Sequence, residues 1–195
     1  MSITNKEIWD QLNHFVSVIP KQYFDALLTL HQKLDSKNID WVVNGELAER
    51  LRIVQIEAEC IEIVSSKEDV ERIFQLVQEF EPQSITFQTR RLLRNAAIEG
   101  REYPVYVRSY YFDFELNSVK IRVNGDLQFK VDDWDWGDVF EFAPEYVYVV
   151  GKKIAVTPLS IASELYRNLG WTDRVEKIRE VTLKNHSQKI KPKLD

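Results

Sequence analysis

The chain has 195 residues and a mass of 23.0 kDa, a length typical of one domain or of one domain with a helical extension. With 44% hydrophobic and 29% charged residues, six glycines and six prolines, its composition is that of a globular protein and excludes collagen-like or low-complexity sequence. The net charge of −5 disfavours broad, non-specific binding to nucleic acid.

The cysteine content and the hydropathy of the chain indicate the cellular compartment in which the protein is expected. The single cysteine, Cys60, cannot form an internal disulfide, which is typical of a reducing environment. One cysteine and three histidines provide few of the ligands that a zinc site needs. No apolar run reaches the roughly 18 residues of a membrane span, and the N-terminus lacks the apolar region of a signal peptide. We therefore expect a cytoplasmic protein with no membrane partner.

Residues 1–38 are predicted to form an N-terminal helical part. The first helix begins at a capping pattern, Thr4 to Glu7, and the second follows Pro20 and ends near Ser36. The apolar positions recur at helical spacing in both: Ile8, Leu12, Phe15, Val16 and Ile19, then Tyr23, Phe24, Leu27, Leu28, Leu30 and Leu34.

An α/β core is predicted over residues 39–156. Short apolar runs at 41–43 and 61–64 predict two strands with a turn and a short helix between them, and this short connection favours adjacent strands in one mixed sheet. A helix then runs to about Phe80, with a possible strand at 85–88. From residue 105 onward, alternation predicts antiparallel strands with turns at Asn117-Ser118 and Asn124-Gly125, and a last hairpin over 146–156. Residues 90–100 show no clear pattern.

Residues 157–195 are predicted to hold the C-terminal helices and a basic tail. Thr157 and Pro158 begin a helix that Gly170 ends, and a second helix spans about 173–183, followed by a frayed tail from Lys184. Apolar residues of the first of these helices should face inward: Leu159, Ala162, Leu165 and Leu169. The whole is an α+β fold, a mixed β-sheet flanked by helices, in one compact domain.

The strand, glycine turn, helix and strand of residues 41–64 resemble the minimal, polymerase-beta-like nucleotidyltransferase-fold family. In that family the first strand ends in Gly-Gly or Gly-Ser, and the helix often opens with Leu-Ala. Asn44-Gly45 keeps one glycine here, and Leu47-Ala48 matches the helix. The resemblance covers roughly Ile39 to Val131, and the helices from Thr157 to Leu183 are similar to the family's trailing helices.

The carboxylates of the family motif are largely replaced. The family carries Asp-x-Asp on the second strand and a third carboxylate on a later strand, which together hold two Mg²⁺ ions on a nucleoside triphosphate. Cys60 and Glu62 stand at the first two positions, and Lys120 or Arg122 at the third. Cys is a poor Mg²⁺ ligand, and a basic residue would repel the metal or pair with Glu62.

The resemblance thus implies one candidate site without metal ligands. Glu62 is the candidate catalytic residue, and the expected nucleotide-binding residues are Asn44, Gly45, Cys60, Glu62, Lys120 and Arg122. No cofactor is expected, and Mg²⁺ would be needed only by an active transferase. If the second strand were shifted by one residue, Glu57 and Glu59 would instead lie together on one face, as the carboxylate pair of the motif.

Three functions remain open at this stage. The chain is a nucleotidyltransferase-like protein without catalysis that binds a nucleotide, another anion or a protein; or an active nucleotidyltransferase with an atypical acid set; or an antitoxin-like partner of another protein.

Other charged clusters favour structural interpretations. The run of Asp132, Asp133, Asp135 and Asp138 is typical of a solvated loop, with Trp134 and Trp136 folded onto the core, more than of a metal loop. Arg90, Arg91, Arg94 and Arg101 favour a solvated helix face over a phosphate grip. The three histidines, His14, His31 and His186, lie far apart in the sequence.

Overall fold

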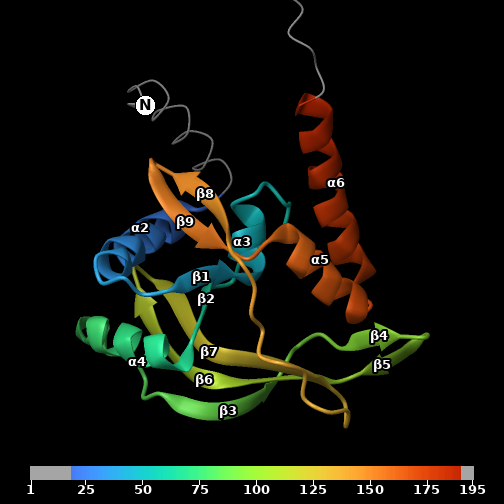
Figure 1. Cartoon of the computed structure of the whole chain (residues 1–195), viewed down its shortest axis with the longest axis horizontal. Coiled ribbons are helices and arrows are strands. Elements are labelled where there is room, and N and C mark those ends of the chain that lie inside the picture. Colours follow the sequence, from blue (N-terminus) through green and yellow to red (C-terminus); the bar gives the residue numbers. More distant parts are fainter. Residues whose placement is uncertain (1–18, 190–195) are drawn as a thin grey trace, which may run out of the picture.

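The computed structural model describes residues 19–189, so the predictions for residues 1–18, the first helix among them, lie outside the described residues. Its centre is a seven-stranded mixed sheet with the order β3-β6-β7-β2-β1-β9-β8 (Figure 1). Its strands are β1 (Trp41–Asn44), β2 (Ile61–Ser65), β3 (Thr86–Arg91), β6 (Val105–Leu116), β7 (Val119–Val131), β8 (Glu145–Val149) and β9 (Lys152–Val156). Strands β1 and β2 pair antiparallel, which confirms their predicted adjacency. The α+β class is confirmed as well.

One face of the sheet is apolar because alternate residues of each strand point to the same side. This face packs against α2 (Lys21–Asp35) and α4 (Lys67–Leu76), which is followed by a short 3₁₀ turn, η1 (Gln78–Phe80). Completely buried side chains from both layers form this core: Leu27, Leu30, Val43, Ile63, Ile73 and Ile121. The intervening strand residues therefore lie on the opposite face, where polar side chains gather.

Strand β7 corrects the predicted hairpin turn at Asn124-Gly125. The strand runs through both residues without turning, from Val119 to Val131. A Cβ atom on Gly125 would lie 2.6 Å from Cγ2 of Val70 on α4, so glycine is needed here for close packing. Asp126 has a φ of +49°, and the pairing with β6 shifts register at Arg108/Tyr110. The turn-forming residues thus produce a bulge within a long strand.

The polar region after residue 90 also differs from its prediction. Arg90 and Arg91 end strand β3 and are not on a helix, and Arg101 begins β5 (Arg101–Tyr103), which pairs with β4 (Ala96–Ile98) in a separate two-stranded sheet. The aspartate-rich segment is a loop, as expected, but Trp134 is 52% exposed. Its neighbour Trp136 stacks under the Arg108 guanidinium, 4.5 Å from the ring centroid.

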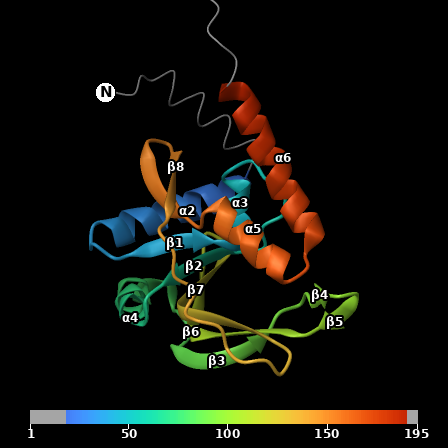
Figure 2. The same cartoon turned by 45° about the vertical axis from the view of Figure 1, so that its right-hand side comes forward.

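The C-terminal helices α5 (Leu159–Asn168) and α6 (Thr172–Lys189) lie on the side of the molecule away from α2 and α4 (Figures 1 and 2). They pack beside the short helix α3 (Gly45–Arg50) and the β4–β5 hairpin. The inward-facing prediction is confirmed, because Ala162 and Leu169 are buried and Leu159 and Leu165 pack on the same clusters. Helix α6 continues through residues 184–189, which were predicted to be frayed.

The division into residues 1–38, 39–156 and 157–195 stays a prediction. Between residues 19 and 189, no helix combines the length and apolar character needed to cross a membrane.

Candidate functional site

A row of polar residues crosses four neighbouring strands on the face opposite the core. Asn44 of β1 stands opposite Glu62 of β2, Glu62 stands opposite Arg122 of β7, and Arg122 stands opposite Asp113 of β6. The pairing therefore brings together three of the predicted site residues. It also decides between the two basic candidates, since Arg122 and not Lys120 is the neighbour of Glu62.

The Glu62 carboxylate is held by amide groups. Nδ2 of Asn124 donates a 3.0 Å hydrogen bond to Oε1 of Glu62, and the Asn44 side chain provides another. Asn124 is completely buried, and its Oδ1 accepts hydrogen bonds from Arg90 (2.6 Å) and Ser109 (3.0 Å). Burial raises the pKa of Glu62, against the opposing charges of Arg90 and Arg122. The carboxylate is thus fixed in place by this chain's own side chains.

Gly45 is required by two features of its position. Its φ of +63° lies in the left-handed region, which favours glycine. A Cβ atom there would also come within 3.0 Å of Oε2 of Glu62. The glycine turn, which the resemblance assigns to nucleotide binding, therefore approaches a carboxylate of the same chain.

The first turn of α3 carries a negative charge that is paired with α6. Glu46 forms a 2.8 Å ion pair with Arg174, whose guanidinium also lies 3.8 Å from Oε2 of Glu49. Glu49 is 1% exposed and accepts a hydrogen bond from the Tyr166 hydroxyl of α5. Burial raises the pKa of Glu49, partly offset by Tyr166 and Arg174. These contacts join α5 and α6 to α3 beside Glu62, and a phosphate approaching this turn would meet the Glu46 carboxylate.

Two guanidinium groups beside Glu62 have unused hydrogen-bond donors. Within residues 19–189, no hydrogen bond or ion pair engages Arg122. The Arg90 guanidinium lies 3.9 Å from the centroid of the Tyr111 ring, and its buried Nε has no partner among the described residues. Lys120, in contrast, pairs with Asp113 at 2.6 Å, and Asp113 also accepts from the Tyr111 hydroxyl.

The residues at this site do not fit a pair of Mg²⁺ ions, which need several oxygen ligands. Glu62 is the one carboxylate in the motif positions, and Asp113 is engaged by Lys120 and Tyr111. Burial raises the pKa of the Cys60 thiol to about 11, so it is protonated at neutral pH. Among the described residues, no three His, Cys, Asp or Glu side chains converge as metal ligands. Glu57 and Glu59 precede β2 and are exposed, so the shifted register is wrong.

Sequence reasoning missed several residues that contact or flank Glu62. Asn124 was assigned to a turn, and Asp113, Glu46 and Arg174 were not singled out. Asp113 alone had a local signal, because it is a polar residue within an aromatic run of a predicted strand. Arg174 lies more than 100 positions from Glu46 in sequence, so only the fold brings the two together.

The fold is similar to solved structures. A candidate nucleotidyltransferase from Thermotoga maritima superposes with a TM-score of 0.58 and 22% identity, over 85% of this chain and 96% of that one. This chain has a nucleotidyltransferase fold. Two structures of the antibiotic-resistance factor ANT(2'')-Ia, one in complex with adenylyl-2''-tobramycin, give TM-scores of 0.47 and 0.44 at 9% and 10% identity. They cover 85% and 87% of this chain and 91% and 94% of theirs. No family model and no curated protein matches the sequence.

The raised pKa of Cys60 predicts a poorly reactive thiol. At pH 8, alkylation by iodoacetamide should be about 100-fold slower in the folded chain than in urea, because the thiolate fraction falls as the pKa rises. The rate should climb with pH toward about 11. Mass spectrometry of timed reactions measures both rates, and equal rates at pH 8 would show that the fold does not protect the thiol.

Proposed function

We propose that this nucleotidyltransferase-fold protein does not transfer nucleotides and uses the face around Glu62 to bind a phosphate-containing anion without metal. The observation that carries the proposal is the strand register between β2 and β7, which sets Arg122 directly opposite Glu62, at the position where the resemblance expects a third carboxylate. A guanidinium at that position supplies the positive charge that a metal ion supplies in an active enzyme.

The surrounding contacts support both parts of this proposal. Asn44 and Asn124 form hydrogen bonds with the Glu62 carboxylate, so a metal ion would have to displace them. The Arg122 guanidinium, which has no hydrogen bond or ion pair among the described residues, offers planar donors that suit phosphate oxygens, and the nearby charge of Arg90 adds to the positive field. The Glu46 carboxylate lies in the first turn of α3 and would repel an anion there. We therefore expect the anion on the strand face and not at that helix.

Calorimetry with ATP and with pyrophosphate tests the proposal. Binding should be as tight in EDTA as in Mg²⁺, because no metal bridges the ligand to the protein. Arg122→Gln should weaken binding about tenfold through loss of charge-assisted hydrogen bonds. Arg101→Gln, on the exposed β5 strand, is the matched control and should leave affinity unchanged. Binding that requires Mg²⁺ and survives Arg122→Gln would overturn the proposal.

A further inference from the structure

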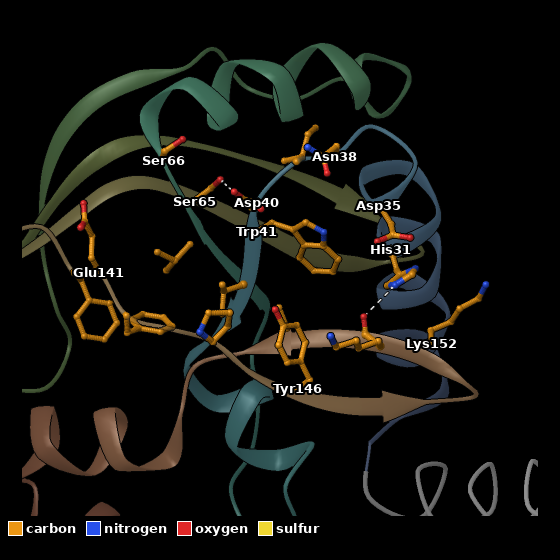
Figure 3. A pocket seen from close by; sticks show the side chains of 18 of the residues that line it. His31, Asp35, Asn38, Asp40, Trp41, Ser65, Ser66, Glu141, Tyr146 and Lys152 are labelled. Atoms are coloured by element: carbon orange, nitrogen blue, oxygen red, sulfur yellow. Dashed lines mark hydrogen bonds between the residues drawn. The ribbon is translucent and has the colours of Figure 1, made fainter. Parts of the chain in front are cut away.

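A cavity of about 940 Å³ lies beside strands β1 and β9, and its lining includes His31, Trp41 and Tyr146 (Figure 3). These parallel strands are paired only at Val43 and Val156, and the cavity opens toward their other ends. Its volume is in the range of pockets that bind ligands. Side chains of α2, β1, β2, β9 and the segment before β8 line it.

Apolar and acidic side chains both line the cavity. The apolar part of the lining, called the floor here, includes Val42, Val64, Phe140, Phe142 and Ala155. Four carboxylates lie around it, against two ammonium groups: Asp35, Asp40, Asp126 and Glu141 against Lys152 and Lys153. Among the described residues, none of the four carboxylates has an ion-pair partner, and Asp126 accepts only the backbone N–H of Lys67.

Tyr146, an aromatic residue of the lining, already contacts the ammonium group of Lys153. Nζ of Lys153 lies 3.8 Å from the centroid of the Tyr146 ring, and Tyr146 is 50% exposed. A cation over an aromatic face is stabilised by the ring's electrostatic field. Tyr146 thus brings an aromatic ring and one ammonium group of this chain to the cavity.

Two buried side chains in the lining have unused polar groups of opposite kind. Trp41 is 8% exposed, and no hydrogen-bond partner of its indole N–H exists among the described residues. His31 is 7% exposed, and its Nε2 must donate to the Lys153 carbonyl, so in the neutral ring Nδ1 is an acceptor without a described partner. The two rings lie next to each other, with centroids 6.3 Å apart. One donor and one acceptor together complement a peptide group.

We propose that this cavity binds an extended, basic segment of a partner protein. A peptide carbonyl and N–H meet Trp41 and His31, and lysine or arginine side chains reach the carboxylates while their aliphatic stems cover the floor. A simple polyamine supplies the charge but has no acceptor for the Trp41 N–H. The proposal concerns a different set of residues from the anion site and does not rest on it.

Calorimetry of the full chain with a capped hexapeptide of alternating lysine and valine tests this proposal. The peptide should bind, and the double substitution Asp40→Asn/Glu141→Gln should weaken it about tenfold, as should Tyr146→Ala. Tyr148→Ala is the matched control, since Tyr148 is 56% exposed two residues along the same strand but does not line the cavity. Trp41→Phe keeps an aromatic ring and should weaken the peptide through loss of the donor.

Three outcomes would overturn the proposal. A glutamate–valine hexapeptide that binds equally well would contradict the charge preference. Spermidine that binds as tightly as the basic peptide would identify a site for amines alone. An equal loss in Tyr148→Ala would place binding elsewhere. Arg122→Gln should leave the peptide affinity unchanged. The peptide test is therefore independent of whether the face around Glu62 binds an anion.

Discussion

Gly170→Ala should lower the free energy of unfolding by about 4 kcal/mol or prevent folding, an effect at the upper end for single substitutions. Gly170 has a φ of +67°, and a Cβ atom there would lie 1.8 Å from the carbonyl oxygen of Ala97. No side-chain rotation can relieve this contact, because the atoms of Ala97 that the added Cβ would meet belong to the backbone. Ala97 also donates its N–H to the Leu169 carbonyl, so this contact joins the end of α5 to the β4–β5 hairpin.

Gly100→Ala is the matched control for this prediction. Gly100 has a φ of +75°, but nothing lies within 4 Å of the position of its Cβ atom. Its substitution should therefore cost only the left-handed backbone strain, about 1 kcal/mol. Urea unfolding followed by circular dichroism compares the two variants. Equal losses would show that the close approach at residue 170 contributes nothing beyond the backbone angle.

Asn124→Ala should cost about 3 kcal/mol, the second-largest effect that we expect. The completely buried Asn124 amide joins Glu62, Arg90 and Ser109, so its removal leaves the buried Ser109 hydroxyl and two half-buried charged groups short of a partner. The loss should exceed that of an ordinary buried side chain of this size, because Glu62 and Arg90 carry charge.

Asn168→Ala is the control for that substitution, as Asn168 is exposed at the end of α5. It should change the free energy of unfolding by less than about 0.5 kcal/mol. The same urea titration measures both variants. A loss below about 1 kcal/mol for Asn124→Ala would mean that water replaces the amide and that the Glu62 face is not rigidly assembled.

The sequence predicted local structure on this face better than its contacts. The apolar positions of β2 fix its alternation, so Glu62 could be assigned to the polar face from periodicity alone. The choice between Lys120 and Arg122 depends on the register between β2 and β7, and residues on both of these strands alternate, so either register is compatible with the pattern. The Asn-Gly pair on β7 has the chemistry of a turn, but packing of Gly125 against α4 keeps the chain extended.

The remaining contacts could not be predicted because they join distant segments. Arg90 and Asn124 lie on strands that do not pair directly, and their contact depends on β6 standing between β3 and β7. The cavity between β1 and β9 had no sequence signal, since its lining comes from separate stretches of chain between residues 31 and 155 and no motif marks it.

We propose that Glu62 and its neighbours form a site that does not transfer nucleotides. The most direct measurement follows label from each of the four nucleoside triphosphates, with Mg²⁺ or Mn²⁺, into protein, RNA and small-molecule acceptors, with Glu62→Ala as the comparison. Our account predicts no transfer by either protein above the level without protein. Metal-dependent turnover by the natural sequence that Glu62→Ala abolishes would contradict it and establish an active transferase with an atypical acid set.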